Sequence, residues 1–236
     1  MEYGSDHAEL YDLVFASRGR DPQAEAESLT ALIRSRSHGA KSLLDVACGT
    51  GAHLETLARH FGDVEGLEYS PGMLRFAERR LPELTVHPGD MRTFDAVTCM
   101  FYAIAEIGSA AELTASVGRM GAHLNPGGVL VLEPWFFPDK FIDGYVGGHM
   151  VTENGRIVAR MTHSVRQGSK TRMQIKFVVA DASGFREFTD VLLTSLFTRE
   201  EYETALRCAG FSTEFLPDAD LPGRPHSPGL FIGIRD

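Results

Sequence analysis

The sequence is poor in positive charge and in cysteine, and it contains no long apolar run. Its 23 Lys and Arg residues face 32 Asp and Glu residues, which gives a formal net charge of −9. A nucleic acid is therefore not expected as a partner, because its backbone is recognised by basic patches. No apolar run approaches the ~20 residues of a membrane-spanning helix, and the first residues lack the basic and apolar regions of a secretory signal. We expect a cytoplasmic protein with neither nucleic-acid nor membrane partners.

The three cysteines, Cys48, Cys99 and Cys208, are widely separated and odd in number. That spacing fits neither a disulfide framework nor a metal site. We expect reduced thiols and no bound metal.

What the sequence does contain is a regular alternation of short apolar runs and helical patterns. The runs are hydrophobic throughout, as in strands that are buried on both faces. Strands are expected at 43–47, 64–68, 84–87, 95–101 and 129–133, and helices within 8–35, up to His60, at 70–80 and at 112–124. Asp21-Pro22 and Ser70-Pro71 have the cap-and-proline pattern of helix starts. The pattern predicts an α/β protein with a mostly parallel sheet and helices on both faces.

The pattern changes after Trp135. Candidate strands at 152–164, 171–180 and 185–195 follow one another with no helix between them, joined by turn-like segments. Helix and strand patterns return after residue 195, where Thr198 and Glu201 have the spacing of a capping box. We expect residues 1–135 and 196–236 to form one domain and residues 136–195 to form a small antiparallel β meander inserted in it.

The most informative segment is "LLDVACGTGAHLETL", residues 43–57, a strand that runs into a glycine-rich turn and a helix. A dinucleotide fingerprint needs a small third residue where Leu54 stands, and a phosphate-binding P-loop needs a Gly-Lys-Ser/Thr that is absent. Asp45, ahead of the turn, suits a ligand that carries an ammonium group. Glu68 ends the second strand, where a carboxylate can accept both ribose hydroxyls. Asp90 can accept a hydrogen bond from an adenine amino group, and Met91 can lie against the ring.

Adenine, ribose and an ammonium group without a diphosphate together describe S-adenosylmethionine. The order of Asp45, Gly49, Gly51, Glu68 and Asp90 on consecutive strand ends resembles the class I S-adenosylmethionine-dependent methyltransferases. The resemblance implies their Rossmann-like sheet. Taken singly, the glycines could be turn residues, Glu68 a solvated strand end and Asp90 a helix cap.

Further segments narrow the resemblance. They are "AELYDL", "GLEYSPGMLRFA", "GDMRTF", "VTCMF", "VLEPWFFP", "THSVR" and "SLFTREEYE". Together they resemble the bacterial N,N-dimethyltransferases that act on nucleotide-linked amino sugars in antibiotic biosynthesis. This implies transfer of methyl groups to the amine of a dTDP-linked amino-deoxysugar, an antiparallel platform for the sugar nucleotide, and a homodimer. A methyltransferase for oxygen or carbon of another small metabolite, and a non-catalytic S-adenosylmethionine-binding protein, remain alternatives.

The resemblance also implies residue roles. The expected substrate-binding residues are an aromatic wall of Trp135 and Phe136, a diphosphate site of His163, Ser164 and Arg166, and Arg224 near the end of the chain. Trp135 could instead be a core residue, and Arg166 an ordinary surface charge. In the cofactor site, Tyr3 and Tyr11 are expected on an N-terminal lid and Arg20 at the methionine carboxylate. The remaining expected cofactor residues are Asp45, Ala47, Gly49, Gly51, Glu68, Tyr69, Met73, Asp90, Met91 and Met100.

Several positions depart from the family pattern, among them Phe136 where a second tryptophan is usual and a short segment between Met91 and Val97. After "CMF", members carry "SSIGHL" where this chain has "YAIAEI", so Glu106 replaces a histidine near the reacting amine. Near the end of the chain, Pro228 stands where family members have an arginine. Arg224, four residues earlier, can take the place of that arginine. Glu106 is our candidate catalytic residue, which either accepts the proton that an alkylammonium must lose or orients the amine through a hydrogen bond, provided that burial raises its pKa. A surface glutamate on a helix is the competing reading.

Overall fold

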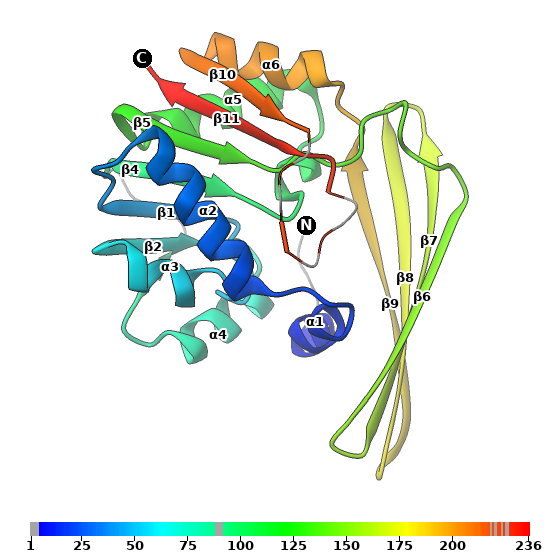
Figure 1. Ribbon diagram of the computed structural model, residues 1–236. Coiled ribbons are helices and arrows are strands. Elements are labelled where there is room, and N and C mark those ends of the chain that lie inside the picture. Colours follow the sequence, from blue (N-terminus) through cyan, green and yellow to red (C-terminus); the bar gives the residue numbers. More distant parts are fainter. Residues whose placement is uncertain (1–4, 88–91, 218, 220, 223, 225–226) are drawn as a thin grey trace.

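Two β-sheets of different kinds form the molecule in the computed structural model, which describes residues 5–87, 92–217, 219, 221–222, 224 and 227–236 (Figure 1). Sheet A has seven strands in the order β10-β11-β5-β4-β1-β2-β3, and sheet B has four in the order β6-β7-β8-β9. The strands of sheet A are β1 (Ser42–Val46), β2 (Asp63–Leu67), β3 (Thr85–His87), β4 (Phe94–Cys99), β5 (Leu124–Leu132), β10 (Phe211–Leu216) and β11 (Leu230–Arg235). The strands of sheet B are β6 (Tyr145–Glu153), β7 (Arg156–Gln167), β8 (Lys170–Asp181) and β9 (Gly184–Ser195).

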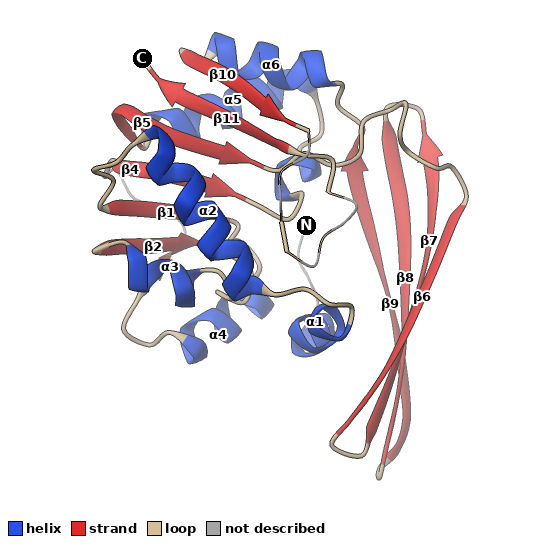
Figure 2. Cartoon of the chain, in the orientation of Figure 1, coloured by secondary structure: helices blue, strands red, loops and turns tan. Residues whose placement is uncertain are grey.

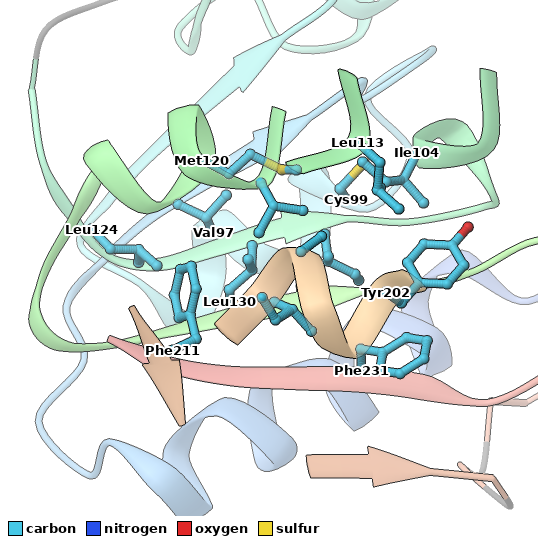
Figure 3. Close-up of a cluster of buried hydrophobic side chains, with 14 of the residues drawn as sticks. Val97, Cys99, Ile104, Leu113, Met120, Leu124, Leu130, Tyr202, Phe211 and Phe231 are labelled. Atoms are coloured by element: carbon cyan, nitrogen blue, oxygen red, sulfur yellow. The ribbon is translucent and has the colours of Figure 1, made fainter. Parts of the chain in front are cut away.

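Helices cover both faces of sheet A, as predicted (Figure 2). They are α2 (Pro22–Arg36), α3 (Leu54–His60), α4 (Pro71–Arg80), α5 (Ala110–Ala122) and α6 (Arg199–Cys208), while α1 (Ser5–Ser17) lies between the sheets. One buried cluster joins α5 and α6 to sheet A and contains Tyr202, Phe211 and Phe231 (Figure 3). A second cluster joins α2 and α3 to the opposite face. Strands buried from both sides explain why their sequences are apolar throughout.

The helix starts follow local chemistry. The side chains of Asp21, Ser70 and Ser109 each accept a hydrogen bond from a backbone N–H in the first turn of α2, α4 and α5. Thr198 and Glu201 form the predicted capping box of α6. These side chains satisfy N–H groups that would otherwise lack a partner.

Sheet B is the predicted antiparallel meander, with one strand more than the three that were expected. The additional strand is β6, whose register pairs Tyr145 with Ser164 and Glu153 with Arg156. It was missed because Gly147 and Gly148 interrupt its strand pattern. The inner face of sheet B is covered by α1. There Leu10 and Val14 pack against Val158, Ile175, Phe177 and Val179.

The strand order of sheet A reverses between β1 and β4, which are parallel neighbours. In open α/β sheets the crevice at the carboxyl ends of such strands binds ligands. The glycine-rich turn follows β1 there, and a turn at Phe101 and Tyr102 follows β4. Within the described part of the chain, no helix is long and apolar enough to cross a membrane.

Candidate functional site

The glycine-rich turn after β1 has the backbone of a ligand cradle. Ala47, Gly49 and Gly51 have φ angles of 58°, 60° and 76°, a region that favours glycine. The Glu68 carboxylate accepts hydrogen bonds from the N–H of Gly49 at 2.8 Å and of Ser70 at 2.6 Å. No atom lies within 4 Å of a Cβ placed on Gly49, so the turn is open on that side. These residues fit a nucleoside whose ribose faces Glu68.

Asp45 is a buried carboxylate beneath this turn, with 2% of its surface exposed. The Thr98 hydroxyl on β4 donates a hydrogen bond to it at 2.7 Å. Burial raises the pKa of Asp45, while the nearby His53 and Arg20 oppose that shift. Asp45 therefore links β1 to β4 at the point where the strand order reverses.

Helix α1 lies over the cradle and is fastened to it. The Thr50 hydroxyl donates to Asp12 at 2.8 Å, and Arg80 of α4 donates to the other Asp12 oxygen at 2.5 Å. On the opposite side, Glu9 pairs with Arg156 and Arg186 of sheet B. The position of Tyr11 on α1 fits the expected lid.

A cavity of about 690 Å³ opens between α1, the carboxyl end of β4 and the inner face of sheet B. Seven of the expected site residues meet there: Tyr11, Arg20, Glu106, Trp135, Phe136, Ser164 and Arg224. Tyr102 and Trp135 contact edge to face at 4.9 Å between ring centroids, and Trp135 and Phe136 do so at 5.0 Å. The cavity therefore has the predicted aromatic wall, to which Tyr102 adds a ring that the motifs did not indicate.

Glu106 ends a short 3-10 helix, η1 (Ala103–Glu106), and lines the same cavity. Burial raises the pKa of this carboxyl, and the negative charge of Glu68 adds to the shift. A carboxylate with a raised pKa is a stronger base than a solvated one, as proton transfer near neutral pH requires.

The remaining expected residues lie elsewhere. His163 needs a correction: its side chain is exposed on the outer face of β7, whereas Ser164 is 2% exposed and faces the cavity. Adjacent strand residues point to opposite faces, so the two cannot share a ligand. Arg166 also lies outside the cavity lining and donates to the carbonyls of Gly168 and Pro138.

The other residues expected at the cofactor lie outside the cavity lining or outside the described residues. Met73 and Met100 are buried next to the cradle elements, and the side chain of Tyr69 is 79% exposed. Tyr3, Asp90 and Met91 lie outside the described residues.

The cavity also contains a cation that the motifs did not indicate. Arg160 lies two positions before Thr162 and four before Ser164 on the inner face of β7, and it is 8% exposed. Its guanidinium lies 5.8 Å from the Phe15 ring centroid. Every second residue of a strand points to the same face, so counting back from Ser164 would have indicated Arg160 if the inner face of the strand had been known.

Opposite charges are packed at the inner end of the cavity. Arg20 pairs with Glu25 at 3.2 Å, His53 contacts the same carboxylate at 2.7 Å, and Arg224 pairs with Glu133. Burial would raise the pKa of Glu25, but its hydrogen bond to His53 and the charges of Arg20 and Arg224 lower it. The ion pairs therefore hold Arg20 and Arg224 at the cavity with their charges compensated.

Comparisons with known proteins agree with this geometry. A family model described as "Methyltransferase domain" matches residues 43–128. The dTDP-3-amino-3,4,6-trideoxy-alpha-D-glucopyranose N,N-dimethyltransferase of Streptomyces venezuelae is 48% identical, over 98% of this chain and 99% of its own. The dTDP-4-amino-2,3,4,6-tetradeoxy-D-glucose N,N-dimethyltransferase of Saccharopolyspora spinosa is 45% identical, over 99% and 94%.

A solved structure is similar to this chain over nearly its full length. The S-adenosylmethionine-bound amino pentose methyltransferase CalS10 of Micromonospora echinaspora superposes with a TM-score of 0.86 at 49% identity, covering 96% of this chain and 97% of its own.

Proposed function

Because the chain belongs to the S-adenosylmethionine-dependent N,N-dimethyltransferases of dTDP-linked amino sugars, we propose that it methylates the amine of a dTDP-linked amino-deoxysugar in natural-product biosynthesis. The observation that carries the proposal is the cavity that joins the carboxyl end of β4 to the inner face of sheet B. Its lining joins Tyr11 of α1, the helix that lies over the cofactor cradle, to Arg160 and Ser164 of sheet B.

Methyl transfer from a sulfonium is an in-line displacement, and S-adenosylmethionine supplies the activated methyl group. The protein has to align the amine with that group at roughly 3 Å in a pocket that excludes water. Tyr11 and Phe15 of α1 and the Tyr102–Trp135–Phe136 wall are the side chains suited to exclude water.

The amine must lose a proton before it can attack. We assign this proton to Glu106, because its carboxylate lines the cavity and its pKa is raised by burial. The negative charge of Glu106 also favours binding of an ammonium-bearing sugar. This role explains how the chain can function with a carboxylate in place of the histidine expected from the resemblance.

The substrate's diphosphate needs cations and hydrogen-bond donors away from the reacting amine. We assign Arg160 and Ser164 of β7 to it, together with Lys140 from the segment between β5 and β6, because all three line the cavity. A guanidinium suits this site because its planar array of donors matches phosphate oxygens. Arg160 thus takes the place that the motifs gave to Arg166, and residues 136–195 form the substrate-binding insertion.

The test is turnover of the purified protein with S-adenosylmethionine and two synthetic sugars, dTDP-3-amino- and dTDP-4-amino-deoxyglucose. We expect mass spectrometry to detect one and then two added methyl groups on one of them. Calorimetric titration should show binding of S-adenosylhomocysteine, followed by binding of dTDP to the saturated complex. Binding of S-adenosylhomocysteine without dTDP binding or turnover would contradict the proposed substrate and favour an unrelated acceptor.

Glu106→Gln tests the proton acceptor. The wild-type kcat/KM should fall as the pH is lowered and Glu106 becomes protonated, and the variant should lose both rate and this pH dependence. An unchanged kcat/KM from about pH 6 to pH 9 would remove Glu106 from the mechanism.

We further propose that the enzyme is a cytoplasmic homodimer. The outer face of sheet B supports self-association, because Val146, Met150, Met161 and Leu193 are between 46% and 72% exposed there, and exposed apolar patches mark interaction surfaces. Sedimentation velocity should give a dimer for the wild type and a monomer for Met161→Lys. A wild-type monomer at micromolar concentration would contradict the proposal.

A further inference from the structure

Two consecutive residues with left-handed backbone follow β4. Phe101 and Tyr102 have φ angles of 55° and 69°, which non-glycine residues adopt only when their surroundings hold them there. The turn directs Tyr102 into the aromatic wall and leads into η1, which ends at Glu106. Whatever holds this turn therefore sets the position of the acceptor side of the cavity.

The carboxylate of Glu133 is one group that holds it. Glu133 follows β5 and is fully buried. Its N–H donates to the carbonyl of Cys99 at 3.0 Å, and its Oε2 accepts from the N–H of Phe101 at 2.7 Å. The same residue thus contacts the last residue of β4 and the first left-handed residue.

The second carboxylate oxygen contacts a segment far away in sequence. Oε1 of Glu133 accepts hydrogen bonds from the Arg224 guanidinium and, at 3.0 Å, from the Ser227 hydroxyl. Both residues lie between β10 and β11 and line the cavity. Glu133 therefore connects the turn after β4 to this C-terminal segment, although its own side chain is not part of the cavity lining.

Arg224 completes the connection by contacting the rings that the turn carries. Its guanidinium carbon lies 4.6 Å from the ring centroid of Phe101 and 5.0 Å from that of Tyr102. The guanidinium of Arg20 lies 4.3 Å from the Phe101 centroid. Cations over aromatic faces are attracted to them, more strongly where water is excluded.

We propose that Glu133 is a positioning residue of methyl transfer: with Arg224 it holds the Phe101–Tyr102 turn so that Tyr102 and Glu106 face the acceptor. The expected effect of Glu133 on turnover rests on the proposed function, whereas its effect on the placement of the turn does not. It involves no contact between Glu133 and the substrate or the cofactor.

The replacement Glu133→Gln is a sharp test because the three groups named on its carboxylate oxygens, the Phe101 N–H, Arg224 and the Ser227 hydroxyl, are donors. A carboxylate only accepts, whereas an amide must turn its NH2 toward one of these donors. The matched control is Glu65→Gln. Glu65 lies in β2, outside the cavity lining, and is another buried carboxylate that pairs with an arginine, Arg92. Any general effect of neutralising a buried carboxylate that pairs with an arginine should appear in both variants.

We expect Glu133→Gln to lower kcat by about 10- to 100-fold, the scale of a misplaced reacting group, with the Kd for S-adenosylhomocysteine changed by less than about twofold. The control should keep kcat within about twofold of the wild type. The single tryptophan, Trp135, gives a readout independent of turnover, since it contacts the Tyr102 ring. Acrylamide quenching of its fluorescence should increase in Glu133→Gln and stay unchanged in Glu65→Gln.

A double-mutant cycle with Arg224→Gln tests the pairing. If Glu133 and Arg224 act as one unit, the double variant is no slower than the slower single variant; additive losses of activation free energy would overturn the inference. Should Glu133→Gln fail to fold, Ser227→Ala removes one donor to the same oxygen and should lower kcat by about threefold while raising quenching. Equal behaviour of Glu133→Gln and Glu65→Gln in both kcat and quenching would also overturn it. Absence of turnover in the wild type would instead contradict the proposed function, and the quenching comparison would still decide the placement of the turn.

Discussion

Gly66 offers a direct test of how tightly the cofactor cradle is supported. It lies in the middle of β2, with Asp45 of β1 and Val86 of β3 as its register partners. A Cβ at this position would lie 2.7 Å from Cδ1 of Leu54 and 2.8 Å from Sγ of Cys48. Both side chains belong to the glycine-rich turn or to the helix that follows it, so Gly66→Ala pushes the cradle away from β2.

The size of the effect follows from this crowding. Leu54 is fully buried and protein interiors are close-packed, so we expect an overpacking cost of about 1–3 kcal/mol. At about 2–4 °C per kcal/mol for a chain of this size, Tm should fall by roughly 2–12 °C. If the displaced cradle loses about 0.7–1.4 kcal/mol of binding free energy, the Kd for S-adenosylhomocysteine rises about three- to tenfold.

Gly118 provides the matched control. It lies inside α5, and nothing approaches within 4 Å of a Cβ placed there. Gly118→Ala should stabilise the protein by about 0.5–1 kcal/mol, since alanine favours helix over glycine, with no change in Kd. Differential scanning calorimetry and calorimetric titration of both variants measure these quantities. A Gly66→Ala protein with wild-type Tm and Kd would refute the reasoning.

Three further predictions concern single side chains. Thr198→Ala removes the capping box of α6, so Tm should fall by about 2–4 °C, for a loss of about 1 kcal/mol, with cofactor binding intact; a change in Kd would contradict this. Burial raises the pKa of Glu106, so the folded state loses stability as the pH rises through that pKa. Glu106→Gln should therefore melt above the wild type near pH 8, by a margin that vanishes near pH 4; a margin independent of pH would count against it. Nδ1 of His7 donates a hydrogen bond to the Asp190 carboxylate at 2.5 Å, and burial lowers the pKa of His7 despite that carboxylate. Stability should fall as the pH drops below the unfolded value of about 6.5, and the slope of Tm against pH should be shallower in His7→Asn than in the wild type.

The alternation of strands and helices, the helix caps and the cradle could be predicted from sequence because each depends on neighbours along the chain. Ser70, Pro71 and the glycines after β1 determine their own backbone geometry. The alternation of apolar strands and helices then leaves few topologies open.

The acceptor side was less predictable because it depends on contacts between distant segments. Strand alternation separates His163 from Ser164, but only the packing of α1 on sheet B determines which of them faces the cavity. Arg224 was expected near the site as a replacement for a missing arginine. Its pairing with Glu133 requires the return of the chain from β10 to β11, which no local pattern indicates.

The strand order of sheet A also has a consequence for synthesis on the ribosome. The four strands of sheet B are consecutive hairpins, a topology rich in local contacts that can form early. In contrast, β11 occupies residues 230–235 and inserts between β5 and β10. Sheet A therefore stays open at β5 until residues 230–235 have been synthesised, and Arg224 is fixed beside Glu133 only when β11 is in place. The nascent chain can complete sheet B early, whereas the site at the carboxyl end of β4 is complete only after β11 has paired with β5.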